Sequence, residues 1–136
     1  MRAVLDPNVF ISALLSRSGA PAQGVARWVA GDFELVVSEL LLAELGRALG
    51  YPKVRTLVPA ADAAGFLALL RHAAVVAPDP SALSLRSPDP GDEHLLALAE
   101  SERAMLVSGD RHLIGLAGFL PIRTPRAFLE ALEEEI

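Results

Sequence analysis

Apolar residues along this chain fall into short continuous runs separated by longer stretches with helical spacing. The short runs predict strands that are buried on both faces of a sheet. These strands lie at Arg2–Leu5, Phe33–Val37, Ala73–Ala77, Ala104–Val107 and Pro121–Arg123. The stretches between them repeat apolar residues every three or four positions, which predicts helices. The helices lie at 7–14, from Pro21 to about Gly31, from an N-cap at Ser38 to about Leu49, and at 53–57, 60–71, 89–103, 111–117 and 125–134.

Strands that alternate with helices are typical of an α/β fold. We therefore predict three layers, with a central parallel sheet of about four to five strands and helices on both of its faces. The chain has 136 residues, shows no repeat, and has no segment that reads as a linker between domains. One domain spanning residues 1–136 is expected.

The composition removes several classes of chemistry. The chain has no cysteine, which excludes disulfides, thiolate zinc sites and cysteine nucleophiles. Carboxylates interrupt every long apolar stretch, so we expect a soluble, cytoplasmic protein with no membrane contact. The net charge is −5, which disfavours non-specific wrapping of nucleic acid. It leaves a phosphodiester substrate possible, because a metal ion can supply positive charge locally.

Four acidic residues occupy notable positions. Two follow strands, where α/β folds place ligand sites, and two lie on helix faces that are otherwise apolar. Asp6 and Asp110 each follow a predicted strand, and ligand sites of open α/β sheets lie at the carboxyl ends of the strands. Glu44 falls within the apolar stripe of its helix, and Asp92 shares a face with apolar residues three, four and seven positions on. A carboxylate directed at a core is costly unless it is paired or bound to metal.

Each acid also has a purely structural interpretation. Asp6 and Asp110 could cap the helices that follow them, and Glu44 could lie at a helix edge. Asp89 before Pro90 resembles an N-cap, with Asp92 as the acid of a capping box. Four acids converging on one edge would nevertheless repel one another and require a cation. All are oxygen ligands, which favours Mg²⁺ or Mn²⁺ over Zn²⁺. We assign no part in this site to the histidines, His72, His94 and His112.

Four segments of the chain resemble the acidic motifs of PIN domains, in the same order. The segments are Arg2 to Leu15, Ser38 to Leu45, Asp89 to Ala99 and Leu106 to Leu113. The first resembles the family's opening strand followed by Asp-Thr-Asn, with Pro7 where threonine is commoner. The overall pattern is most similar to bacterial and archaeal PIN proteins of toxin–antitoxin systems, the relatives of VapC toxins.

The resemblance implies a PIN-like fold and assigns roles to individual residues. The metal-binding and catalytic quartet would be Asp6, Glu44, Asp92 and Asp110, with Asp89 as an auxiliary acid. Asn8 and Ser108 would orient the carboxylates by hydrogen bonding. Pro7 removes a hydroxyl and an N–H group, but it suits the first position of a helix.

The activity implied is Mg²⁺- or Mn²⁺-dependent hydrolysis of RNA. Arg17, Arg86 and Arg111 are candidates for holding RNA phosphates, although the more usual role of such arginines is that of solubilising surface residues. The resemblance also implies a cognate antitoxin protein and a homodimer. A rival interpretation is a non-catalytic PIN scaffold that binds RNA or protein.

Overall fold

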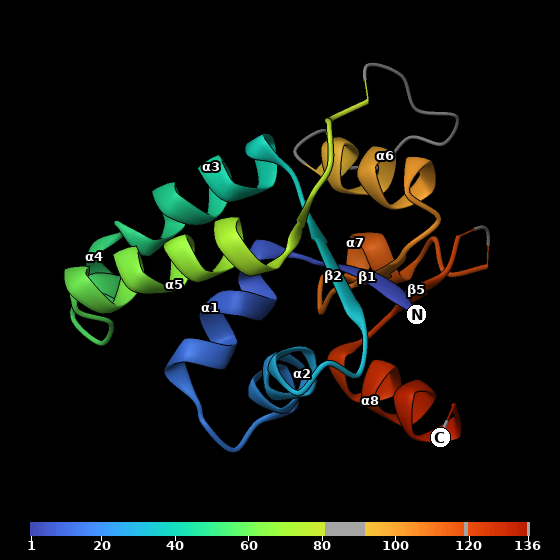
Figure 1. Ribbon diagram of the computed structural model, residues 1–136, viewed down its shortest axis with the longest axis horizontal. Helices are drawn as coiled ribbons and strands as arrows, with labels where there is room; N and C mark the ends of the chain where they lie inside the picture. The colour runs from blue at the N-terminus through green and yellow to red at the C-terminus, as the bar shows by residue number, and fades with distance from the viewer. Residues whose placement is uncertain (81–91, 119, 136) are drawn as a thin grey trace.

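Five parallel strands form the centre of the computed structural model, which describes residues 1–80, 92–118 and 120–135 (Figure 1). The strands are β1 (Arg2–Leu5), β2 (Glu34–Val37), β3 (Val75–Val76), β4 (Met105–Val107) and β5 (Ile122–Arg123). Their order across the sheet is β3-β2-β1-β4-β5, and every neighbouring pair is parallel. The predicted α/β fold with a parallel sheet is therefore confirmed.

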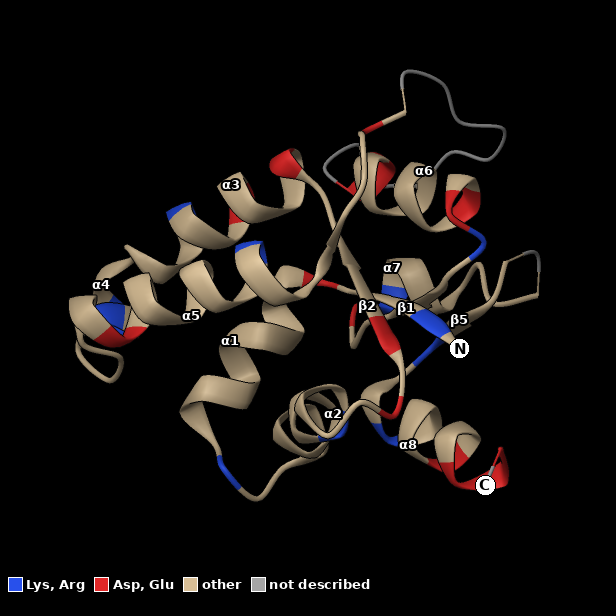
Figure 2. Ribbon diagram, in the orientation of Figure 1, with Lys and Arg blue, Asp and Glu red and all other residues tan. Residues whose placement is uncertain are grey.

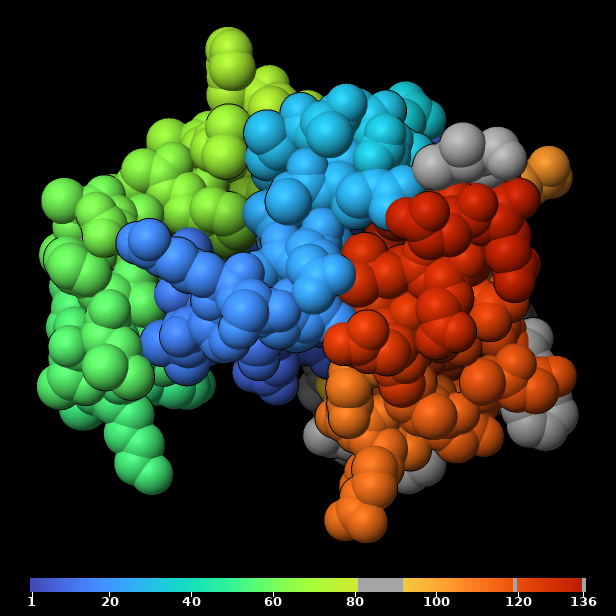
Figure 3. Space-filling model, turned by 90° about the horizontal axis from the view of Figure 1, so that it is seen from below, coloured from blue at the N-terminus to red at the C-terminus, as the bar shows by residue number. Residues whose placement is uncertain are grey.

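Helices cover both faces of this sheet. They are α1 (Pro7–Leu15), α2 (Ala20–Val29), α3 (Glu39–Leu49), α4 (Pro52–Arg55), α5 (Ala60–Ala73), α6 (Glu93–Ser101), α7 (Arg111–Ile114) and α8 (Pro125–Glu134). Figure 1 shows α6 on one side of the sheet and α1, α2 and α8 on the other, with α3 and α5 packed beyond α1. In the space-filling view of Figure 3, α8 in red lies directly beside α2 in blue.

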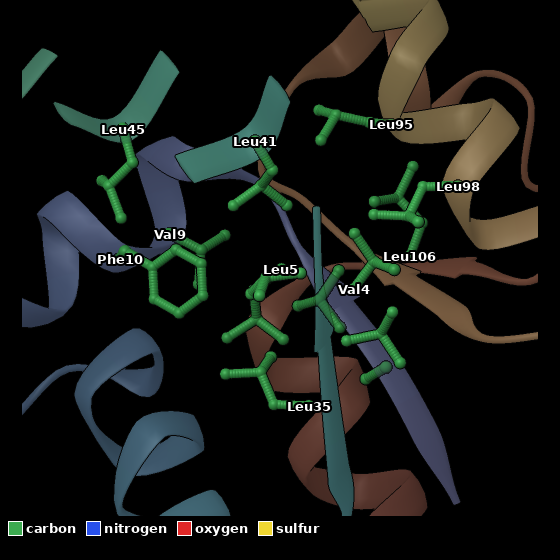
Figure 4. Packing of buried hydrophobic residues seen from close by; sticks show 14 of the residues in the cluster. Val4, Leu5, Val9, Phe10, Leu35, Leu41, Leu45, Leu95, Leu98 and Leu106 are labelled. Atoms are coloured by element: carbon green, nitrogen blue, oxygen red, sulfur yellow. The ribbon is translucent and has the colours of Figure 1, made fainter. Parts of the chain in front are cut away.

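The central strand is buried on both faces, which explains why its sequence is continuously apolar. Ala3, Val4 and Leu5 are each at most 1% exposed. Figure 4 shows Val4 on the side of Leu98 in α6, whereas Leu5 points to the side of α1. Successive side chains of a strand point to opposite faces, so two layers of helices require apolar residues at every position.

Polar side chains at strand ends begin the helices. The Asp6 carboxylate accepts a hydrogen bond from the backbone N–H of Asn8, and the Ser38 hydroxyl accepts one from Leu41. The hydroxyl of Thr124 caps α8 in the same way. α1 begins at Pro7, whose missing N–H has no helical partner to lose at this position. The capping role predicted for Ser38 is confirmed, and Asp6 acts as a cap in addition to any other role.

Three elements are shorter than the pattern predicts. β3 contains only the two residues in register with β2, because α5 continues through Ala73 and because β3 is an edge strand with one neighbour. α6 ends at Ser101, since Arg103 adopts a left-handed conformation with φ of 51° that closes the helix. α7 ends at Ile114 and continues as single turns through residue 117. The start predicted for α6, at Asp89, lies outside the described residues, and the other ends agree with prediction to within two residues.

The topology places a crevice at the carboxyl ends of β1 and β4. The chain leaves β1 towards β2 and β3 on one side, and leaves β4 towards β5 on the other. Neighbouring strands whose connections diverge in this way define the switch point at which open α/β sheets bind ligands. Within the ranges that the structure describes, no helix is long and apolar enough to cross a bilayer.

Candidate metal centre

The residues that follow β1 and β4 form a hydrogen-bonded unit at this switch point. The backbone N–H of Asp6 donates to the carbonyl of Val107 at 2.9 Å, which extends the pairing of the two strands into the site. The fully buried Ser108 donates its hydroxyl proton to Asp6 Oδ2 at 2.8 Å. The same hydroxyl oxygen accepts a hydrogen bond from the backbone N–H of Asp110 at 3.0 Å. Ser108 therefore ties the two aspartates together.

The other oxygen of Asp6 is held from its own helix. Asp6 Oδ1 accepts the backbone N–H of Asn8 at 3.0 Å, so the contact from Asn8 comes from its main chain rather than its side chain. Asp110 Oδ1 accepts the N–H of His112 at 2.7 Å in the equivalent position before α7. Both aspartates thus cap the next helix while presenting their carboxylates at the sheet edge.

Burial makes the charge of Asp6 costly. The residue is 5% exposed, and loss of hydration raises the pKa of its carboxyl group. The carboxylates of Glu44 and Asp110 raise it further, against the opposing hydrogen bonds from Asn8 and Ser108. A carboxyl group whose folded pKa is raised destabilises the fold as the pH rises through that pKa. A bound cation would remove this cost.

Glu44 reaches the same region from α3. Its charge acts on Asp6, and its Oε2 atom lies 2.7 Å from Nε2 of His94 in α6. His94, to which the sequence assigned no part in the site, is half-buried, and its ring lies against the Glu44 carboxylate. The available signal was the helical spacing of His94 with the buried Ala97 and Leu98, which places it on the inner face of α6.

Asp92 stands at the beginning of α6. It is the N-cap residue of that helix, with its side chain making no capping hydrogen bond to the described backbone of α6. The sequence had offered Asp89 as the cap, and Asp89 lies outside the described residues. Figure 2 shows acidic segments both on α3 and at the start of α6, on the side of the molecule where His94 meets Glu44.

The carboxylates are neighbours rather than a closed ligand set. Among the residues described, no three Asp, Glu or His side chains lie close enough together to hold a metal ion as they are placed. Asp6 and Asp110 do line one open pocket of about 350 Å³, together with Asn8, Ser12, Pro21 and Pro125. Figure 3 shows a hollow between the blue surface of α1 and the orange surface that follows β4. A buried carboxylate with a raised pKa beside two further acids is a donor set that fits a hard divalent cation.

Two of the candidate RNA-binding arginines can be placed. Arg111 is exposed and directly follows Asp110, which lines the pocket. Arg17 is exposed in the segment between α1 and α2. Arg86, like Asp89, lies outside the described residues.

These observations define an α/β fold of PIN type, with acidic residues at the switch point of a five-stranded parallel sheet. The sequence profile of the PIN domain matches residues 2–112, and the chain belongs to that family. Members of the family are typically metal-dependent nucleases. A search among curated proteins finds no significant match.

The fold is similar to that of a chain in a solved structure, the crystal structure of VapBC2 from Rickettsia felis bound to a DNA fragment from their promoter. The superposition covers 91% of this chain and 98% of that one, with a TM-score of 0.62 and 15% sequence identity. At this identity the similarity establishes the fold alone.

Proposed function

We propose that this PIN domain is a cytoplasmic, divalent-metal-dependent endoribonuclease that forms the toxin component of a toxin–antitoxin pair. The observation that carries the proposal is the buried carboxylate of Asp6, joined through Ser108 to Asp110 at the switch point, with its pKa raised by burial and by Glu44 and Asp110. Similarity to a chain of the VapBC2 structure supports an antitoxin partner. A single domain over residues 1–136 and a homodimer complete the proposal.

The proposed ligands are the carboxylates of Asp6, Glu44, Asp92 and Asp110, with Asp89 as an auxiliary acid. A Mg²⁺ or Mn²⁺ ion held by these carboxylates would supply Lewis acidity towards the scissile phosphate and the attacking water. Ser108 and the backbone N–H of Asn8 hold both oxygens of Asp6, so this ligand is oriented before metal arrives. Hydrolysis adds water across the P–O3′ bond, which leaves a 5′-phosphate and a 3′-hydroxyl.

The experiment that tests the proposal is cleavage of RNA by the purified protein in Mn²⁺ and in EDTA. The alternative is a non-catalytic PIN scaffold that binds RNA or protein. Metal-dependent cleavage that is lost in Asp110→Asn supports the nuclease. RNA binding without cleavage in any divalent ion favours the scaffold.

We expect Asp92→Asn to abolish or greatly reduce cleavage and to leave the metal-free fold as stable as before, or more stable. Loss of one charge relieves repulsion among the acids, while the metal loses a ligand. Asparagine is as good an N-cap as aspartate, and the Asp92 side chain makes no capping hydrogen bond to the described part of α6. Thermal melts in EDTA beside cleavage assays in Mn²⁺ measure both effects. A destabilised but fully active variant would restore the helix-capping interpretation.

Arg111→Ala is expected to raise the KM for RNA several-fold with a smaller change in kcat. An exposed guanidinium beside the acidic pocket can neutralise a flanking phosphate, and such contacts position the substrate without specifying sequence. The variant should also flatten the dependence of binding on salt by about one phosphate contact. Arg55→Ala on α4 is the matched control. Equal KM values and salt slopes in all three proteins would remove Arg111 from the RNA-binding surface.

A further inference from the structure

One side chain close to the proposed metal ligands has no role in the function as described so far. His94, in the first turn of α6, places Nε2 2.7 Å from Oε2 of Glu44 in α3. The contact joins helices whose residues are 50 positions apart in the chain. The two side chains are 20% and 39% exposed, so the contact is partly shielded from water.

The direction of this hydrogen bond follows from its chemistry. An ionised carboxylate can only accept, so Nε2 of His94 carries the proton that is donated. The bond occupies one lone pair of Glu44 Oε2 and leaves Oε1 available to a cation. A glutamate side chain has three rotatable bonds, and a hydrogen bond that selects one conformer reduces the freedom lost when metal binds.

The opposite edge of the imidazole makes no competing hydrogen bond within the part of the chain that the structure describes. Nδ1 of His94 is buried and has no hydrogen-bond partner among residues 1–80, 92–118 and 120–135. The ring is instead held by its place on the inner face of α6, in line with the buried Leu98. Within the described part of the chain, the His94 ring therefore makes its side-chain hydrogen bond to Glu44.

We propose that His94 is a positioning residue that holds the Glu44 carboxylate in the orientation needed to bind the divalent cation. The inference rests on the proposed function, in which Glu44 is a metal ligand. His94 acts through Glu44 and touches neither the metal nor RNA. Partners that orient metal ligands typically change metal affinity by about 10- to 100-fold when they are removed.

The test compares His94→Leu with His94→Gln, measuring the Kd for Mn²⁺ by calorimetry in the absence of RNA. Leucine fills the space without a donor, and we expect it to weaken Mn²⁺ binding about 10-fold or more. Glutamine carries an N–H donor at a similar reach, and it should recover most of the lost affinity. Melting temperatures in EDTA should differ little between these two variants. His72→Leu, at the exposed end of α5, is the matched control.

A double-mutant cycle with Glu44→Ala separates positioning from direct ligation. Once the Glu44 carboxylate is gone, adding His94→Leu should weaken Mn²⁺ binding no further. An additive loss in that background, or equal losses in the leucine and glutamine variants, would show that His94 binds the metal itself. Unchanged Mn²⁺ affinity in His94→Leu would reduce the contact to a link between helices.

The outcomes for His94 and for the nuclease proposal are distinguishable, because Mn²⁺ affinity is read without substrate. A wild-type protein that binds Mn²⁺ but leaves RNA intact overturns the nuclease proposal and keeps the effect of His94. Full cleavage together with unchanged affinity in His94→Leu overturns the role of His94 alone. A wild-type protein that binds no Mn²⁺ overturns both.

Discussion

Replacing Asp6 with asparagine is expected to lower the rate of RNA cleavage by at least about 100-fold and to raise the melting temperature in EDTA. Loss of a residue that merely orients a metal ligand lowers metal affinity or activity about 10- to 100-fold. Loss of the ligand itself should therefore lower the cleavage rate by at least the upper end of that range. The stability change has the opposite sign because burial and two neighbouring carboxylates raise the pKa of Asp6. The charged form of Asp6 is therefore less favourable in the folded protein than in the unfolded chain.

Asparagine is a demanding test because it preserves the local structure. Its side-chain oxygen can still accept the N–H of Asn8, and its amide can donate to the hydroxyl oxygen of Ser108. Asp62→Asn, an exposed position in the first turn of α5, is the matched control and should retain full activity. A destabilised Asp6→Asn protein with wild-type activity would identify Asp6 as a helix cap and nothing more.

Chelation of divalent metal is expected to abolish cleavage, and addition of Mn²⁺ or Mg²⁺ should raise the melting temperature of the wild-type protein. A ligand that binds only the folded state stabilises it by about 2.7 kcal/mol when present at 100 times its Kd. Here the cation would also offset the repulsion that Glu44 and Asp110 impose on Asp6. Cleavage assays and thermal melts across a metal titration measure the two effects together.

The rise in melting temperature on adding metal should depend only on the acidic residues at the carboxyl edge of the sheet. Asp110→Asn should lose most of the metal-induced rise in melting temperature, whereas the Asp62→Asn control should keep it. Ca²⁺ is a useful comparison because it also takes oxygen ligands, but with longer bonds and more of them. Full activity on clean RNA in the presence of EDTA would rule out the proposed mechanism.

Strand positions and helix starts were predictable because they depend on local pattern. The run from Ala3 to Leu5 is apolar at every position, as a strand buried on both faces requires. The Ser38 hydroxyl caps α3 by accepting the backbone N–H of Leu41, three residues along the chain. An isolated copy of the segment could form the same hydrogen bond. Asp6 and Asp110 were identified as candidates for the same reason, since each directly follows a strand.

Strand and helix ends were less predictable where a neighbour decides them. β3 is short because it lies at the edge of the sheet and pairs with β2 over two residues. α6 ends where Arg103 adopts a left-handed conformation, which is uncommon for a residue other than glycine. Neither feature has a strong sequence signature.

The sequence by itself determined the class of fold, the helix caps and the acidic character of the strand ends. Only the tertiary structure decided that β1 lies next to β4, and so that Ser108 reaches Asp6 across 102 positions of chain. It also decided that His94 of α6 meets Glu44 of α3. Local periodicity reports which face of an element is buried, whereas strand order and helix packing decide which distant polar groups share that face.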